Sequence, residues 1–233
     1  MLAPLSVSLV ALFTGYAYAA VKFARTYGGG GNDRFTSIQQ TSDGGYIVVG
    51  YTTSFGAGNL DIFLIKTDAY GNVQWAKTYG GTSNDWAYTA QQTSDGGYIV
   101  VGVTYSFGGG SEAFLIKIDA NGNLQWAKTY GGTSNDWASF VRQISGGGYI
   151  VTGTTWSFGA GGGDIFLMRT DANGNLQWFK TYGGTSYEFP RNIVQTSDGG
   201  YIVVGYTTSF GAGGYDILLI KTDENGNLQW AKT

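Results

Sequence analysis

The sequence of 233 residues contains no cysteine and no histidine, and only two prolines. Without cysteine the protein has no disulfide bonds, and its redox compartment cannot be inferred from cysteine usage. Without histidine it lacks the commonest general base and the commonest zinc ligand. Histidine-dependent catalysis and histidine-ligated metal sites are therefore excluded.

Charge is also scarce. Charged residues make up 12% of the chain, the net charge is −3 and the isoelectric point is about 4.8. Lys and Arg are not clustered, so the chain lacks the positive surface typical of nucleic-acid-binding proteins. It also contains no phosphate-binding loop, nucleophile elbow or zinc-protease motif. We expect no nucleic-acid partner, no cofactor and no enzymatic activity.

Repetition is the strongest positive signal. The motif Gly-Gly-Tyr-Ile-Val begins at Gly44, Gly96, Gly147 and Gly199, which gives a period of 51 or 52 residues. A period of this length indicates stacked modules or propeller blades. Forty glycines and 16% aromatic residues suit short strands and tight turns. We therefore predict four repeats, at about residues 30–81, 82–132, 133–184 and 185–233.

Each repeat has the pattern of four short strands. In the second repeat, runs of β-forming residues cover 86–92, 97–103, 113–118 and 123–130. Asp95-Gly96 separates the first two runs and Asn121-Gly122 the last two, and both dipeptides favour hairpin turns. Four antiparallel strands in about 50 residues is the size of a propeller blade. The pattern predicts an all-β protein, a four-bladed β-propeller.

The repeat also resembles a family of secreted bacterial and archaeal β-propeller repeats, over residues 22–233. The matching motifs are Thr-Ser-Asp-Gly-Gly-Tyr-Ile-Val-Val-Gly, Leu-Ile-Lys-Thr-Asp, Gly-Asn-Leu-Gln-Trp and Thr-Tyr-Gly-Gly. The resemblance implies a propeller and an exported protein. It implies little about function, because such folds carry many functions.

The first 21 residues carry no charged side chain, and three interpretations of them are open. A signal peptide fits the Ala17-Tyr18-Ala19 site but lacks a positive n-region. A membrane anchor fits the length, although Lys22 and Arg25 would then lie on the outer side. On all three interpretations the repeats lie outside the cell or at its surface, and membrane contact is confined to residues 1–21.

The third interpretation is an assembly helix. The segment resembles the apolar N-terminal helix of type IV pilins, with Pro4 a few residues from its start. An acidic residue near the start of many bacterial pilin helices has no counterpart here. The resemblance implies subunit contacts through an apolar helix that contains Leu5, Leu9, Leu12 and Phe13.

The chain carries one more outer strand than four blades require. Residues 22–28 match the fourth strand of the repeats, yet residues 229–233 supply that strand at the other end. A surplus edge strand pairs readily with a neighbouring molecule. We expect residues 22–28 to form a strand that doubles an outer edge or joins subunits. Its candidate contact residues are Lys22, Phe23, Arg25 and Tyr27.

Three recurring residue sets are candidate sites. The Asp-x-Asn-Gly-Asn turns resemble part of a calcium loop but lack its bidentate Glu, and an Asn-Gly hairpin explains the same residues. The oxygen ligands would come from Asp119, Asn121, Asn123, Asp171, Asn173, Asn175, Asp223, Asn225 and Asn227.

Aromatic rings recur in the Ser-Phe-Gly loops, where they pack between blades or form a contact surface. These rings are Phe55, Phe107, Phe158 and Phe210, with Trp156 beside them.

The third set consists of recurring acids and bases at strand ends. Carboxylate pairs catalyse glycoside hydrolysis, but a simpler interpretation is solvated strand ends with cross-strand ion pairs. Glu188 and Arg191 stand where the fourth repeat departs from the others, so a unique site is expected there if one exists.

The sequence thus favours an exported structural protein, a filament or pilus subunit that assembles into a homopolymer. The alternative is a secreted adhesion or glycan-binding propeller, and an extracellular glycosidase or lyase is the third hypothesis.

Overall fold

The computed structural model describes residues 25–233, which form sixteen strands in four antiparallel sheets. We call the sheets blades 1 to 4. Blade 1 contains β1 (Asp33–Gln40), β2 (Tyr46–Thr52), β3 (Asp61–Thr67) and β4 (Val73–Tyr79). Blade 2 contains β5 (Asp85–Gln92), β6 (Tyr98–Thr104), β7 (Glu112–Ile118) and β8 (Leu124–Tyr130). Blade 3 contains β9 (Asp136–Gln143), β10 (Tyr149–Thr155), β11 (Asp164–Thr170) and β12 (Leu176–Tyr182). Blade 4 contains β13 (Glu188–Gln195), β14 (Tyr201–Thr207), β15 (Asp216–Thr222) and β16 (Leu228–Lys232).

The chain makes each blade as a simple meander, because hairpin turns join neighbouring strands in sequence order. The third and fourth strands of every blade are joined at an Asn-Gly or Tyr-Gly turn whose glycine has φ 75°. A side chain is strained at this angle, so glycine suits the position. The all-β prediction is confirmed. Among residues 25–233 there is no helix, and hence none that could cross a bilayer; the predicted N-terminal helix lies outside the described residues.

Blades pack face to face, and their side chains form three apolar clusters at the three junctions between consecutive blades. Blades 2 and 3 therefore have two buried faces each, and blades 1 and 4 have one. We call the face toward the preceding blade the entry face and the face toward the following blade the exit face. In blade 2, Tyr98 and Val100 lie on the entry face, and Ile99 and Val101 lie on the exit face. Alternation of side chains along a strand thus supplies both faces.

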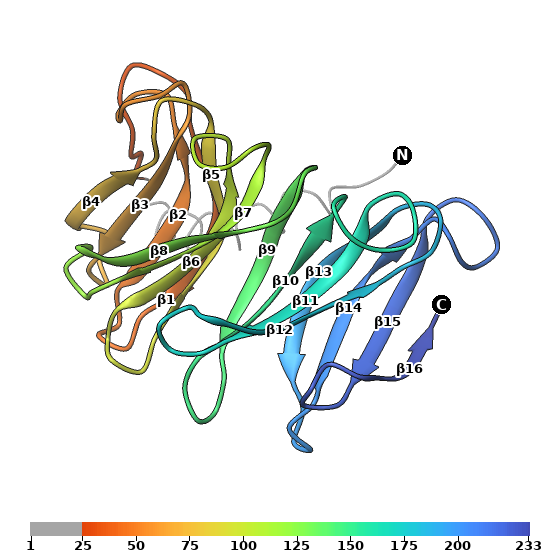
Figure 1. Ribbon diagram of the computed structural model, residues 1–233. Coiled ribbons are helices and arrows are strands. Elements are labelled where there is room, and N and C mark those ends of the chain that lie inside the picture. The colour runs from red at the N-terminus through yellow and green to blue at the C-terminus, as the bar shows by residue number, and fades with distance from the viewer. Residues whose placement is uncertain (1–24) are drawn as a thin grey trace, which may run out of the picture.

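The four blades form an open arc. Blades 1 and 4 lie at opposite ends of this arc in Figure 1, and the outward face of each retains exposed apolar side chains. The expected ring, closed by a terminal strand, is not formed within residues 25–233. Strand pairing within blades and packing between consecutive blades cover both faces of blades 2 and 3. Neither requires blades 1 and 4 to come together.

Buried lysines anchor the inner hairpins to the third strands. Lys66, Lys117 and Lys221 are at most 8% exposed and bond Asp43, Asp95 and Asp198 at 2.8, 2.9 and 2.9 Å. Each ammonium also donates to a backbone carbonyl within its own strand end, as Lys221 Nζ does to Thr222 O at 2.9 Å. The predicted ion pairs are therefore present, but the prediction that these lysines are solvated at strand ends is wrong. A charge that is buried needs this full set of partners.

Blade 3 lacks this bridge. Gly146 occupies the place of the hairpin aspartate, and Arg169 occupies the place of the lysine. The two replacements occur together, as expected if each partner requires the other. Gly146, Gly147 and Gly148 all have positive φ in this turn, so its backbone differs from that of the other blades.

The bridges make stability depend on pH. Hydrogen bonds from Thr196 and then Lys221 lower the pKa of Asp198 to about 2, against about 4 in an unfolded chain. The stabilisation is present above about pH 4 and is lost as the pH falls toward 2. We expect Asp198→Asn to be less stable than the native chain at pH 7, because Lys221 loses its partner. We also expect it to lose less free energy of unfolding between pH 5 and 2. Urea denaturation at both pH values measures the free energy of unfolding. Glu224→Gln, at an exposed position, is the control and should behave as the native chain does. An equal loss of stability in Asp198→Asn and in the native chain would contradict the prediction.

Candidate functional site

The junctions between blades follow one plan. A tryptophan on the outer strand of each blade packs against the first tyrosine of the next blade's second strand, with ring centroids 6.0 to 6.1 Å apart. The outer strand ends in a tyrosine whose hydroxyl donates to a glycine carbonyl of the next blade, as Tyr79 does to Gly122 at 2.6 Å. Burial raises the pKa of Tyr79, so this hydroxyl remains a donor. Tryptophan and tyrosine together fix the outer half of the junction.

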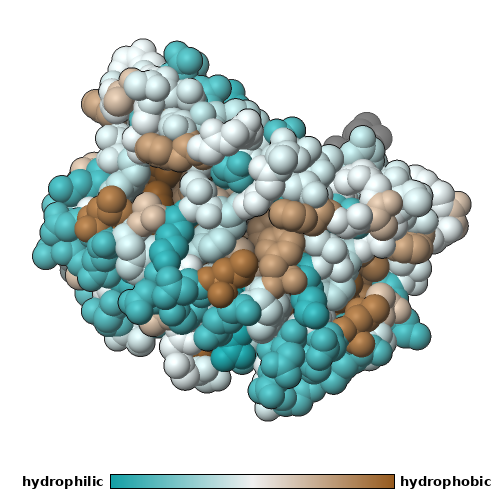
Figure 2. Space-filling view, in the orientation of Figure 1, coloured by the Kyte–Doolittle hydropathy of each residue, from teal (hydrophilic) through white to brown (hydrophobic). Residues whose placement is uncertain are grey.

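The exit face of blade 4 has no neighbour in the described structure. Ile217 is 70% exposed, whereas its counterparts Ile62, Ala113 and Ile165 are at most 2% exposed. Trp230 is 39% exposed and has no tyrosine ring against it among residues 25–233. Figure 2 shows a brown, apolar patch at the end of the molecule where β14 and β15 lie. Blade 4 therefore presents a complete blade face without the blade that should cover it.

The entry face of blade 1 is its counterpart. Ile38 is 64% exposed, but the residues at the same position in the later blades are at most 8% exposed; they are Ala90, Val141 and Ile193. Tyr46 and Val48 are half-buried, whereas the equivalent Tyr98 and Val100 are buried. The sequence analysis missed both faces, although the repeat alignment marks Ile38 and Ile217 as core positions. Together they are the two halves of one blade junction.

The segment Arg25–Gly28 covers the outer part of this entry face. Tyr27 Oη donates to Gly71 O at 2.8 Å, which is the same bond that the outer-strand tyrosines make at the internal junctions. A groove of about 510 Å³ beside it is lined by Arg25, Tyr27, Ile38 and Tyr46, among others. Residues 25–28 are not in a strand, unlike the prediction for residues 22–28. The other predicted assembly residues, Leu5, Leu9, Leu12, Phe13, Lys22 and Phe23, lie outside the described residues.

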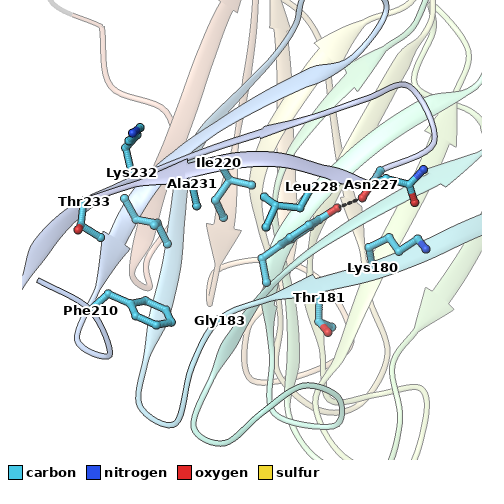
Figure 3. Close-up of a pocket in the computed structure, with 13 residues that line it drawn as sticks. Lys180, Thr181, Gly183, Phe210, Ile220, Asn227, Leu228, Ala231, Lys232 and Thr233 are labelled. Carbon is cyan, nitrogen blue, oxygen red and sulfur yellow. Dashed lines mark hydrogen bonds between the residues drawn. The ribbon is translucent and has the colours of Figure 1, made fainter.

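The Ser-Phe-Gly rings lie along the outer parts of the blades: Phe107 and Phe210 line grooves between neighbouring blades, and Phe55 lines a groove between blade 1 and residues 26–28. The groove between blades 3 and 4 has a volume of about 600 Å³, and Figure 3 shows Phe210, Ile220 and Ala231 lining it. The dashed line is the bond from Tyr182 Oη to Gly226 O. Phe55, Phe107, Phe158 and Phe210 are 46% to 55% exposed. Each ring is thus half packed and half open to solvent, which combines the two interpretations of the sequence.

One of these grooves is filled from within. At the junction of blades 2 and 3, Phe179 packs on Phe158 and Phe166 with ring centroids 5.4 and 5.2 Å apart. The other blades have alanine at this position, namely Ala76, Ala127 and Ala231, and each of these alanines lines a groove. Side-chain size at this one position therefore decides whether a groove is open.

The Asp-x-Asn-Gly-Asn turns use their own carboxylates. Asp119 Oδ1 accepts hydrogen bonds from the amides of Asn121 and Asn123, both at 2.8 Å, and Asn123 Nδ2 donates to Oδ2 at 2.9 Å. These bonds lower the pKa of Asp119. The equivalent bonds occur at Asp171 and Asp223. Within residues 25–233, no group of three or more acidic side chains is placed so that it could hold a metal ion; both turn carboxylate oxygens serve the hairpin.

The recurring acidic residues lie at the junctions between blades. They are buried there, so the prediction that they are solvated is wrong. Asp61 and Asp85 are at most 2% exposed, and a Cβ on Gly80 would lie 2.5 and 2.8 Å from their carboxylate oxygens. The same pairing brings Glu112 to Asp136 and Asp164 to Glu188. Hydroxyl and backbone donors hold them, as Gly81 N holds Asp85 at 2.8 Å. Burial, and after it the charge of Asp136, raise the pKa of Glu112.

Comparisons with known proteins indicate the type of repeat that this chain contains. A family model described as a domain of unknown function (DUF5122), beta-propeller, matches residues 93–124. The chain is also 27% identical to the Regulatory protein FlaEY of Caulobacter vibrioides in an alignment of 174 residues that covers 64% of this chain and 18% of that protein. These matches support a β-propeller repeat. Neither supports the pilin-like interpretation of residues 1–21.

The chain is also similar to two solved structures. One is a subtype N11 neuraminidase-like protein of A/flat-faced bat/Peru (H18N11), with 15% identity, a TM-score of 0.44, and coverage of 88% of this chain and 56% of that one. The other is a eukaryotic initiation factor, with 8% identity, a TM-score of 0.39, and coverage of 85% and 55%. The chain thus spans less than two thirds of each relative. The prediction that the protein is not an enzyme is corrected, because a neuraminidase-like protein is among these matches; at this similarity the match assigns no activity.

The filled groove allows a paired test. We expect Phe179→Ala to lower the free energy of unfolding by about 2 kcal/mol, because it removes a half-buried ring from a packed cluster. We expect Ala127→Phe to change it by less than about 1 kcal/mol, because the groove already has room for the ring. Urea denaturation measures both. A larger loss for Ala127→Phe than for Phe179→Ala would show that the two grooves are not equivalent.

Proposed function

We propose that this protein is a self-assembling propeller subunit, in which the exit face of blade 4 binds the entry face of blade 1 of a second copy. The observation that carries the proposal is the exposure of Ile217 and Ile38 at positions that every internal blade buries. A second copy supplies the missing half junction at each end. Its Tyr46 would receive Trp230, in the way that Tyr201 receives Trp178 at 6.1 Å.

The contact joins two different surfaces, so it is heterologous. Such a contact extends into a fibre unless its rotation closes a ring. An exported filament or pilus subunit remains the form of assembly that we propose, and the uncharged residues 1–21 support export. The low content of charged residues, 12%, is in keeping with a protein that binds its own copies.

Complementary variants test the contact. Ile217→Glu places a charge on the exit face only, and Ile38→Glu places one on the entry face only. We expect the native chain to form oligomers that grow with concentration, and each variant to weaken self-association about ten-fold or more. An equimolar mixture of the two variants should form a dimer that grows no further, because each retains one intact face. Light scattering after size-exclusion chromatography and negative-stain microscopy measure these states.

Leu176→Glu is the matched control, because Leu176 is 50% exposed on an outer strand away from both end faces. It should assemble as the native chain does. A native chain that stays monomeric at high concentration would refute the proposal, and so would an unchanged assembly of both end-face variants.

The segment Arg25–Gly28 should regulate this assembly. Docking with the internal geometry requires the segment to leave the entry face, since the outer strand of the incoming blade takes the same place. Tyr27→Phe removes the bond to Gly71 O and leaves the ring. We expect it to strengthen self-association about five-fold, the effect of about 1 kcal/mol. Sedimentation equilibrium measures the constant. Weaker association of Tyr27→Phe would show instead that the segment is part of the subunit contact.

A further inference from the structure

The innermost strand of every blade contains one bulge. Pairing between the first and second strands skips Thr36 in β1, Tyr88 in β5 and Arg191 in β13, and it skips Ser139 in β9. A bulge turns the extra side chain away from the normal alternation of a strand. The four skipped residues therefore lie outside the regular alternation of the two packed faces, although Thr36 Oγ1 still donates to Ala87 O of the next blade at 2.8 Å.

All four skipped residues line the same cavity. This cavity has a volume of about 420 Å³ and is bounded by the inner strands of all four blades. Strands β1, β5, β9 and β13 contact one another in succession, so the cavity lies on the concave, inner side of the arc. We call it the axial cavity. Its volume falls within the range of small-molecule sites.

The repeats differ most where they meet this cavity. The skipped residue is threonine, tyrosine, serine and arginine in the four blades, and the residue after it is serine, threonine, phenylalanine and asparagine. By contrast, each inner strand ends in the same glutamine, at Gln40, Gln92, Gln143 and Gln195. Packing therefore repeats around the arc, whereas the axial cavity is asymmetric. A single ligand with unequal sides fits such a cavity.

The lining combines one cation with aromatic rings and hydroxyl groups. Arg191 is the one charged side chain among the residues that line the axial cavity. Its guanidinium lies 5.1 Å from the centre of the Tyr206 ring, and it forms no salt bridge within residues 25–233. Trp137 and Phe189 form further walls, and Trp156 packs on both, at 4.9 and 5.9 Å. Trp156 thus supports the aromatic wall from behind.

We propose that the axial cavity binds an acidic saccharide through Arg191 and the aromatic wall. Guanidinium groups bind carboxylates with two parallel hydrogen bonds. Aromatic faces offer a flat apolar surface to the C–H side of a sugar ring. The hydroxyls of Ser37, Thr89 and Ser139 lie in the same lining and are suitable partners for sugar hydroxyls. This site is independent of the end faces, and it places ligand binding at the one part of the repeat that packing does not fix.

Binding of a disaccharide that contains glucuronic acid, compared with its neutral glucose counterpart, tests the proposal. Calorimetry and the fluorescence of the tryptophans provide two readouts. We expect the native chain to bind the acidic disaccharide at least ten-fold more tightly than the neutral one. Arg191→Gln should remove this preference, because the charged hydrogen bonds are lost. Arg191→Lys should retain part of it.

Two further variants separate a local effect from a general one. Lys77→Gln removes an exposed cation from an outer strand and should bind as the native chain does. Ser139→Phe places a ring in the axial cavity at an already irregular position and should block both sugars, while circular dichroism shows the native fold. Equal affinity for the two sugars, native binding by Arg191→Gln, or no binding of either sugar by the native chain would overturn the proposal. Tighter binding of uridine monophosphate would also overturn it, in favour of a nucleotide site.

Discussion

The packing of one blade face against the next is the contact on which this structure depends. A four-stranded blade has two apolar faces and no core of its own, so each face must be covered by a neighbouring blade. The three internal junctions bury Ile62, Ala113 and Ile165 almost completely. At the end of the arc the same position leaves Ile217 in water, where about 1.5–3 kcal/mol of burial is not realised. Within residues 25–233, repetition of a two-faced module therefore leaves two faces uncovered, and the proposed self-association would cover them.

The same constraint explains where the repeats are free to differ. A side chain between two blades must fit the surfaces of both blades, and tyrosine, isoleucine and valine recur at these positions. The bulge residues on the inner strands lie outside the regular alternation of the two packed faces, and they are all different. At the groove position, three alanines and Phe179 show an intermediate case, because the groove accepts either a small side chain or a ring. The repeats thus differ in sequence mainly at the axial cavity and less at the junctions between blades.

Strands, hairpins and the four-fold repeat could be predicted from the sequence, because they follow from local alternation and from Asn-Gly and Asp-Gly turns. The open arc could not, since it depends on the angle between blades. Buried Lys66 and Asp61 were also missed, because these residue types are mostly exposed and their burial requires partners from other strands. The bulges require the pairing register, which a single strand does not reveal. Glu188 and Arg191 were singled out because the fourth repeat departs from the others there. However, Glu188 is buried at a junction, whereas Arg191 lines the axial cavity.

Overlap at the entry face of blade 1 links the start of the described chain to the proposed assembly. Tyr27 bonds Gly71 O, and Arg25 and Thr26 stand at the repeat positions that Lys232 and Thr233 of an incoming blade 4 would occupy. The segment Arg25–Gly28 is joined to blade 1, so it competes at an effective concentration of about millimolar. It offers one hydroxyl bond and a small apolar contact. A second copy offers the whole exit face, with Ile217 and Trp230 both exposed. The proposed assembly would therefore form only when the apolar area gained outweighs the local advantage of the segment, and the segment would then oppose assembly at low concentration.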